Sequence, residues 1–205
     1  RCTHAVPRGL CFLHFTDTMI ELADLERLRA IGLAPHILPL LPEVHADDRL
    51  MRVVEVQRDS VMLHDGASAL RARVLAALHA ALADDDTALA VGDWVYARRN
   101  GLAEWWVHQR VPPANQIARR LHDGRDKVTR VVLVANVDTV LIVMGLDHDF
   151  NPRRLERYIA FARLAQVAAV VVLTKADLVD ADTRAARLHE ALSLVPADVA
   201  VLAVD

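Results

Sequence analysis

The stretch Val170-Val171-Val172-Leu173-Thr174-Lys175-Ala176-Asp177 joins a short apolar run to a polar motif. Four consecutive apolar residues, three of them β-branched, are typical of a buried strand in a parallel sheet. Ligands of such sheets bind beyond the carboxyl ends of the strands, where residues 174–177 would lie. The stretch therefore predicts an α/β segment with a ligand site formed by Thr174, Lys175, Ala176 and Asp177.

The chemistry of these four residues suits guanine, because Asn or Thr, Lys, any residue, Asp is the guanine-recognition motif of GTPases. A carboxylate at Asp177 can accept hydrogen bonds from both the ring N–H and the exocyclic amino group of guanine, a pair that adenine cannot offer. Lys175 would lay its methylene stem along the base, and Thr174 would brace the loop. The alternative is a capped turn in which Asp177 only begins a helix.

Residues on both sides of the motif predict further parallel strands. Residues 139–144 form an apolar run of strand length, and Asn151-Pro152 supplies an N-cap and a first-turn proline for the helix that follows. A second helix over 182–194 and a third strand over 199–204 complete the order strand, helix, strand, helix, strand. This order predicts a parallel sheet with right-handed crossovers.

The phosphate-binding motifs of an ordinary GTPase do not occur in this sequence. None of the seven glycines begins the pattern G-x-x-x-x-G-K-[ST], whose backbone amides and lysine hold phosphates. None follows an aspartate by three residues, as the magnesium-side motif D-x-x-G requires. In ordinary GTPases both motifs precede the guanine motif, so the chain predicts a guanine half-site alone and no catalytic residue.

Residues 49–113 change to a two-residue period. Five short strands with one helix-like interruption over 76–90, and a hairpin signal at Asn100-Gly101, predict a small β-barrel of the OB-fold type. Such barrels often bind single-stranded nucleic acid by stacking bases on aromatic rings. The candidates for stacking are also candidates for the barrel core: Trp94, Tyr96, Trp105 and Trp106.

Residues 114–130 predict a basic connector between the barrel and the α/β segment over 131–205. The connector carries five basic residues against two acidic ones, so it is a candidate for contact with RNA phosphates, and an ordinary solvated linker is the alternative. The basic residues are Arg119, Arg120, Arg125, Lys127 and Arg130.

Residues 1–48 predict a leader followed by a helical extension. The first methionine is Met19, so residues 1–18 are interpreted as leader sequence, and a helix is expected from Met19 onward. Cys2, His4, Cys11 and His14 could gather zinc, but one intervening residue between Cys2 and His4 is tighter than usual ligand spacing, so we expect no metal site.

Whole-chain composition narrows the class of protein. An apolar content of 54% excludes intrinsic disorder, and the net charge of −3 gives no bulk attraction to nucleic acid. The longest apolar run, over 131–146, contains Asn136 and Asp138 and is too short to span a membrane. Two cysteines make no disulfide framework, which indicates a reducing, cytoplasmic setting.

The order of these motifs resembles the ribosome small-subunit-dependent GTPase A (RsgA) family, over about residues 49–205. The resemblance rests on the barrel and on four motifs: Ala135-Asn136-Val137-Asp138-Thr139-Val140, Phe150-Asn151, Arg154-Leu155-Glu156-Arg157-Tyr158 and Val172-Leu173-Thr174-Lys175-Ala176-Asp177. Members of this family carry a circularly permuted GTPase domain, in which the guanine motif precedes the phosphate loop. The resemblance therefore implies that these 205 residues correspond to the amino-terminal portion of a family member.

The resemblance also implies a function. It implies a monomeric, cytoplasmic GTPase that binds GTP and GDP and acts late in maturation of the small ribosomal subunit, with its barrel on ribosomal RNA. It implies that Mg²⁺ and a structural zinc belong to family segments beyond Asp205, so that these 205 residues alone should not hydrolyse GTP. The family's Ser-Ala pair near residues 203–205 has no counterpart here. The rival interpretation is a noncatalytic RNA-binding barrel with a structural α/β domain.

Overall fold

A computed structural model describes residues 12–15, 18–43, 45–122 and 128–205. The chain divides into two compact units, Arg1–Asn136 and Val137–Asp205, and each unit is described by itself. In the part of the chain that the structure describes, no helix is both long enough and apolar enough to cross a membrane.

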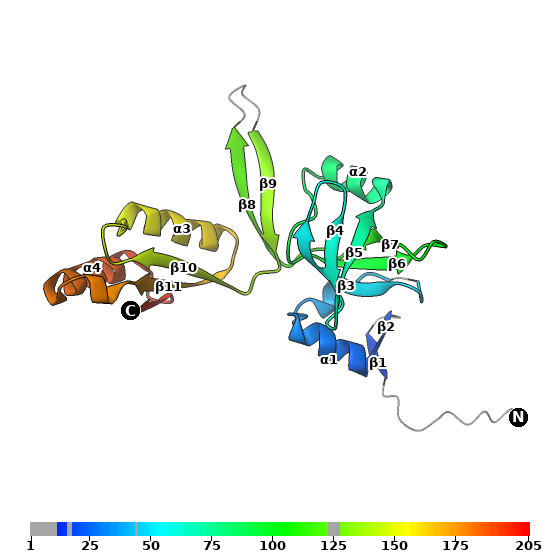
Figure 1. The fold of residues 1–205 in the computed structure, drawn as a ribbon, viewed down its shortest axis with the longest axis horizontal. Helices are drawn as coiled ribbons and strands as arrows, with labels where there is room; N and C mark the ends of the chain where they lie inside the picture. Colours follow the sequence, from blue (N-terminus) through cyan, green and yellow to red (C-terminus); the bar gives the residue numbers. More distant parts are fainter. Residues whose placement is uncertain (1–11, 16–17, 44, 123–127) are drawn as a thin grey trace, which may run out of the picture. The chain divides into compact units, whose positions relative to one another are not determined.

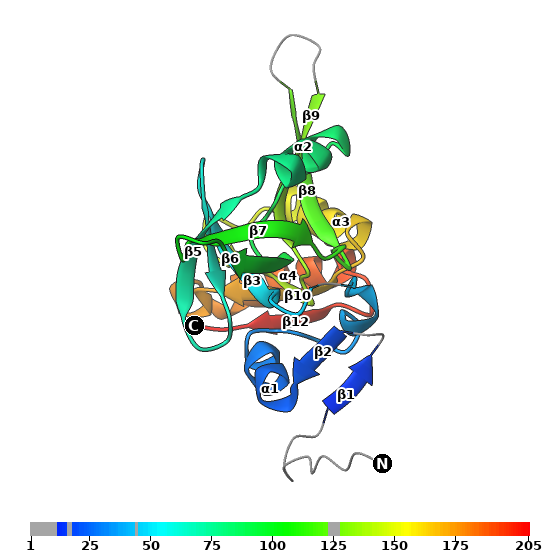
Figure 2. The ribbon, with the colours of Figure 1, turned by 90° about the vertical axis from the view of Figure 1, so that its right-hand side faces the viewer.

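The first unit contains the expected closed five-stranded barrel (Figures 1 and 2). All neighbouring strands pair antiparallel except β5 and β7, which are parallel. Helix α2, Ala76–Asp84, connects β5 to β6 as the helix-like interruption predicted. The strands, in their order around the barrel, are β3 (Arg49–Val56), β4 (Val61–His64), β5 (Ala69–Val74), β7 (Trp105–Arg110) and β6 (Trp94–Arg99).

Side chains of β6 alternate between two cores on opposite faces of the strand. Val95 and Ala97 belong to the cluster that fills the barrel. Trp94 and Tyr96 point outward, where helix α1, Leu22–Ala30, and the segment after it cover them. Both aromatic side chains are almost completely buried, so they are core residues and not stacking platforms. The helix expected as an extension is therefore part of this outer core.

The start of the described chain forms a hairpin where the sequence predicted a leader and the beginning of a helix. Strands β1 (Phe12–Phe15) and β2 (Thr18–Glu21) pair antiparallel, and α1 begins at Leu22, three residues later than expected. Aromatic and β-branched residues in these two segments favour strands. Residues 1–11, with Cys2, His4 and Cys11, lie outside the described residues. A short 3₁₀ turn, Leu38–Leu40, follows α1.

The expected basic connector is mostly a second hairpin, and the division between the units falls after Asn136 (Figure 1). Strands β8 (Gln116–His122) and β9 (Val128–Ala135) pair antiparallel, because the apolar, β-branched run at 131–134 extends the connector into a strand. Arg119 is exposed, and Arg130 donates a hydrogen bond to Gln116. Arg125 and Lys127 lie outside the described residues, as does the tip of the hairpin.

The second unit is the expected parallel sheet, with strands in the order β10 (Thr139–Gly145), β11 (Ala168–Thr174) and β12 (Ala200–Ala203). Helices α3 (Pro152–Leu164) and α4 (Ala181–Leu194) supply the crossovers. As the sequence predicted, Asn151 is the N-cap of α3, where its side chain accepts a hydrogen bond from the amide of Arg154. Asp180 caps α4 in the same way.

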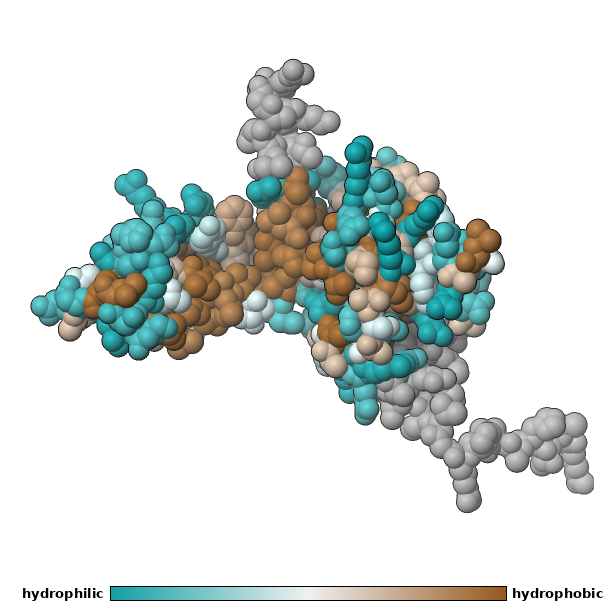
Figure 3. Space-filling model, in the orientation of Figure 1, coloured by the Kyte–Doolittle hydropathy of each residue, from teal (hydrophilic) through white to brown (hydrophobic). Residues whose placement is uncertain are grey.

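The two faces of this sheet differ in burial. Alternate strand residues such as Ile142 and Leu173 pack with α3 and α4 into one core. The residues between them face the other way, and Leu141 and Val143 are 64% and 60% exposed. Figure 3 shows hydrophobic surface on this unit and along the β8–β9 hairpin. One face of the sheet therefore packs against the two helices, and the other face is exposed.

Candidate nucleotide-binding site

The predicted guanine motif lies where the sequence placed it, directly after a buried parallel strand. Strand β11 ends at Thr174, and Lys175 takes a left-handed backbone conformation with φ of 60°. The chain then makes a 3₁₀ turn, Ala176–Leu178, with Ala176 buried beneath it. Asp177 and Lys175 are exposed, so their functional groups are accessible to a ligand at this end of the sheet.

Backbone hydrogen bonds hold this loop to the neighbouring strands. The amide of Ala176 donates to Val204 O at 3.2 Å, and the amide of Leu146 donates to Thr174 O at 2.8 Å. The Thr174 hydroxyl lies 3.5 Å from Met144 O, at the limit of a hydrogen bond. The main chain therefore braces the loop more than the Thr174 side chain does.

Sequence reasoning missed one participant, Asp147. Its Oδ2 lies 2.8 Å from Lys175 Nζ, so the acid in the loop after β10 pairs with the motif lysine after β11. The hydrogen bond from Lys175 is the main cause that lowers the pKa of Asp147, and the same bond raises the pKa of Lys175. The only signal in the sequence is an acid shortly after an expected strand end.

Helix α4 fastens the same loop from the other side. The Arg187 guanidinium donates to the carbonyl oxygens of Leu146 and Asp147, the latter at 2.8 Å. It also lies 5.8 Å from the centroid of the Phe150 ring. The loop after β10 is therefore held by a cation that binds its backbone carbonyls, while the Asp147 carboxylate faces Lys175 and the exposed His148 ring, whose Nδ1 lies 3.2 Å from Oδ2.

Two half-buried tryptophans of the barrel carry arginine neighbours. The Arg49 and Arg99 guanidinium carbons lie 5.8 and 5.0 Å from the Trp105 ring centroid, and that of Arg73 lies 5.7 Å from Trp106. These three arginines are exposed, so their charges remain accessible at the surface beside the two rings. Of the four aromatic candidates, only these two retain exposure that a nucleic acid could use.

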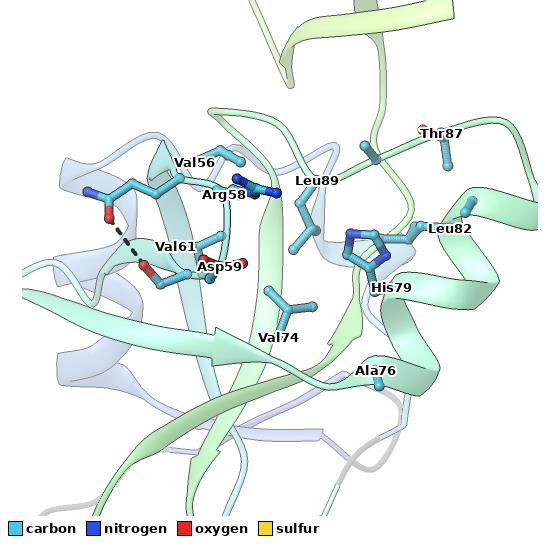
Figure 4. A pocket seen from close by; sticks show the side chains of 14 residues that line it. Val56, Arg58, Asp59, Val61, Val74, Ala76, His79, Leu82, Thr87 and Leu89 are labelled. Atoms are coloured by element: carbon cyan, nitrogen blue, oxygen red, sulfur yellow. Dashed lines mark hydrogen bonds between the residues drawn. The ribbon is translucent and has the colours of Figure 1, made fainter. Parts of the chain in front are cut away.

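The barrel also has a pocket of about 380 Å³ between the β3–β4 turn and α2 (Figure 4). Apolar side chains from the strands face His79 of α2 across it, and Arg58 and Asp59 lie at the turn. The pocket contains none of the residues that the sequence singled out. Among the described residues, no group of three His, Cys, Asp or Glu side chains is arranged to hold a metal ion.

Solved structures with this arrangement define the class of fold. The chain is similar to YjeQ from Thermotoga maritima, with a TM-score of 0.55 and 16% identity over 77% of this chain and 51% of that one. It is also similar to YloQ, described as a circularly permuted GTPase, with a TM-score of 0.55 and 16% identity over 80% of this chain and 55% of that one. The fold is therefore that of a circularly permuted GTPase, which accounts for a guanine motif with no phosphate loop before it.

Sequence comparisons identify the family that the chain resembles. The RsgA GTPase family model matches residues 112–205, which confirms the resemblance. A small ribosomal subunit biogenesis GTPase, RsgA 2 of Vibrio parahaemolyticus, is 34% identical over 167 residues, 81% of this chain and 42% of that protein. The Opitutus terrae RsgA is 44% identical over 98 residues, 43% of this chain and 26% of that protein. The chain thus spans less than half the length of these relatives.

Proposed function

We propose that this chain supplies the guanine-recognition half of a GTP-binding and GTP-hydrolysing factor that acts in small ribosomal subunit biogenesis. One observation carries the proposal: Asp177 and Lys175 stand exposed at the carboxyl end of a parallel strand, in a loop fixed by the neighbouring strands. Asp177 reads the guanine edge, and the Lys175 stem flanks the base. Relatives named as small-subunit biogenesis GTPases support the same assignment.

Direct titration of the chain with nucleotides tests this proposal. GDP and ADP carry the same phosphates and ribose, so any difference between them reports on the base alone. We expect GDP to bind more tightly than ADP in equilibrium dialysis, and Asp177→Ala to remove the difference. Equal affinity for the two nucleotides, or a preference for GDP that survives Asp177→Ala, contradicts the assignment of this site.

In this proposal, complete members of the family hydrolyse GTP, and these 205 residues alone do not. Phosphoryl transfer depends on backbone amides, a lysine and a magnesium ligand around the phosphates, and this sequence has no glycine-rich loop that would supply them. We therefore expect release of phosphate from GTP at the rate of a protein-free control. Turnover that survives extensive purification and is lost in Asp177→Ala would overturn this expectation.

The proposed partner is the small ribosomal subunit, contacted through RNA phosphates by the β8–β9 hairpin and through the barrel. Arg119 and Arg130 are exposed basic residues of this hairpin with described side chains. Substitution of Arg119, Arg120 and Arg125 by alanine should reduce the slope of log affinity against log salt by about two to three, since each phosphate contributes about 0.7 to 0.9. A wild-type slope would remove the hairpin from the interface.

The alternative function, a noncatalytic RNA-binding barrel, has the same RNA contacts and no nucleotide site. It is favoured by the arginine-flanked Trp105 and Trp106, which do not involve the guanine motif. Filter binding of small subunits with and without GDP separates the two functions. RNA binding together with selective GDP binding supports the GTPase assignment, whereas RNA binding without any selectivity for GDP supports the alternative.

A further inference from the structure

The loops after β10 and β11 are joined by one ion pair of unequal exposure. The Asp147 side chain is 12% exposed, and the Lys175 side chain is 46% exposed. Asp147 Oδ1 also accepts a hydrogen bond from the amide of Asp149 at 3.2 Å, which fixes the carboxylate within its own loop. The acid is therefore the anchored member of the pair, and the lysine is the member that reaches toward solvent.

Lys175 has a backbone conformation that residues other than glycine rarely adopt. Its φ of 60° places it in the left-handed region, which is unfavourable unless the surroundings hold it. The contacts that hold it are the backbone hydrogen bonds of the 3₁₀ turn and the ion pair with Asp147. Removal of the carboxylate would leave the direction of the Lys175 side chain to the turn alone.

We propose that Asp147 is a positioning residue of the guanine loop, whose carboxylate holds the Lys175 ammonium so that the lysine stem lies along the base while Asp177 reads its edge. This inference rests on the proposed function, because it assigns Asp147 a role in the same site. Asp147 acts through Lys175 and does not itself contact the base.

Two neighbouring residues show that the fold makes room for this pair. A Cβ at Gly145 would lie 2.5 Å from Asp147 Oδ1, so a larger residue there would displace this carboxylate, and the Cβ would lie 3.4 Å from Lys175 Cδ, in contact with the lysine stem. Arg187 binds the backbone carbonyl of Asp147 at 2.8 Å and fixes the loop without neutralising the carboxylate. The pair thus occupies a space bounded by β10 and held by α4.

The composition of the chain allows this pair to be observed directly. Lys127 and Lys175 are the two lysines in the sequence, so protein labelled with ¹³C and ¹⁵N lysine gives two sets of lysine NMR signals, and Lys127 serves as an internal reference. Asp147→Asn keeps the size of the side chain and removes its charge. Asp149→Asn is the matched control. It also removes one negative charge, two residues after Asp147, from an acid that pairs with Arg154.

The first readout is the state of Lys175 without nucleotide. We expect Asp147→Asn to shift the Lys175 side-chain signals and lower the pH at which they titrate, because the ion pair raises the pKa of Lys175. The Lys127 signals should stay in place, and Asp149→Asn should lower the titration pH of Lys175 less than Asp147→Asn does, because Asp149 acts on Lys175 by charge alone and makes no hydrogen bond to it. Unchanged Lys175 signals in Asp147→Asn would overturn the proposal.

The second readout is the affinity for GDP, followed by the same Lys175 signals. Asp147→Asn should weaken GDP binding by about two- to fivefold, as expected for a partly exposed ion pair, while Asp149→Asn binds like the wild type. GDP affinity that is unchanged in Asp147→Asn overturns the positioning role and leaves the proposed function intact. If GDP does not perturb Lys175 of the wild-type chain, the proposed function fails and the positioning role fails with it.

Discussion

Asn136 has a structural role that its place in a family motif does not reveal. Its buried side chain donates to Gly92 O at 3.0 Å and accepts from the amide of Ala114 at 2.9 Å, so it joins the turn before β6 to the segment before β8. Its φ of 52° lies in the left-handed region, which asparagine tolerates better than most residues. The Asn136 side chain thus pairs with the buried carbonyl of Gly92 and the amide of Ala114, and asparagine suits the positive φ of this position.

Substitution of Asn136 should destabilise the barrel unit. Asn136→Ala leaves the buried carbonyl of Gly92 without this partner and removes the bond to the Ala114 amide, so we expect a loss of about 1 to 3 kcal/mol in the free energy of unfolding. Asn136→Gly loses the same bonds but accepts the positive φ, so it should be about 1 kcal/mol more stable than the alanine variant. The three tryptophans all lie in this unit, and their fluorescence in urea measures the change. Equal stability of Asn136→Ala and wild type would contradict this role.

For single residues, the sequence predicted functional residues that are adjacent in the chain and missed partners that are distant in it. Thr174 to Asp177 could be found because the motif is continuous and follows an apolar run. Asp147 could not be found, because it is 28 residues from Lys175 and the parallel register of β10 and β11 brings the two strand ends together. The burial of Trp94 and Tyr96 depends on α1, which sequence periodicity alone does not place.

The β4–β5 turn shows how one acid shapes an element. The Asp65 carboxylate accepts hydrogen bonds from the amides of Ala67 and Ser68, both at 2.8 Å. Burial alone would raise the pKa of Asp65, but these amides and the nearby Arg27 outweigh burial and lower it. Gly66 has a φ of 92°, and a Cβ there would lie 2.5 Å from Arg27 O, so the turn depends on glycine at this position as well as on Asp65.

The lowered pKa of Asp65 predicts the pH dependence of this turn. Because the folded-state pKa lies below the unfolded value of 3.8, the stabilisation is complete above that value and is lost as the pH falls through the folded-state pKa. Asp65→Ala should cost about 1 kcal/mol at pH 7 and progressively less below pH of about 4. Tryptophan fluorescence in urea measures it, with Asp59→Ala in the β3–β4 turn as control. A cost that does not change between neutral and acid pH would contradict the account.

Strand β10 offers a test of the one-sided packing in the second unit. Ile142 is 4% exposed and packs with α3 and α4, whereas its neighbour Leu141 is 64% exposed on the opposite face. Ile142→Ala should cost about 2 to 4 kcal/mol, and Leu141→Ala should stay within about 0.5 kcal/mol of the wild type. Circular dichroism in urea measures both variants, with tryptophan fluorescence as a readout of the other unit. Similar costs at the two positions would show that the burial pattern is wrong.

At the scale of elements, regular periodicity predicted most strands and helices, and the misses have a common cause. The barrel strands alternate, and the parallel strands are continuous apolar runs, so both could be read from the sequence. The β1–β2 and β8–β9 hairpins were missed because each mixes polar and apolar residues without a clean period. In β8 the apolar residues Ile117 and Ala118 are adjacent and are followed by two arginines, so polar and apolar residues do not alternate as in a regular strand.

The whole chain combines a complete barrel with a parallel sheet whose second face is exposed. Parallel sheets are usually covered on both faces, and here Leu141, Val143 and Leu202 are more than half exposed. The chain also spans less than half the length of the curated relatives described above. Recognition of guanine by residues 174–177 is the function that we propose for this chain's own residues.

The most direct measurement of this claim is a competition between GDP and XDP for the wild-type chain and Asp177→Asn. The variant replaces a carboxylate, which only accepts hydrogen bonds, with an amide whose NH2 would face the donors of guanine. It should therefore lose about 2 to 4 kcal/mol of affinity for GDP, because a charged hydrogen-bonded pair is broken. Its amide NH2 can donate to the carbonyl oxygen that xanthine carries in place of guanine's exocyclic amino group, so XDP should become the preferred ligand of the variant while GDP remains that of the wild type. An Asp177→Asn variant that still prefers GDP as strongly as the wild type would contradict the account and remove Asp177 from the site.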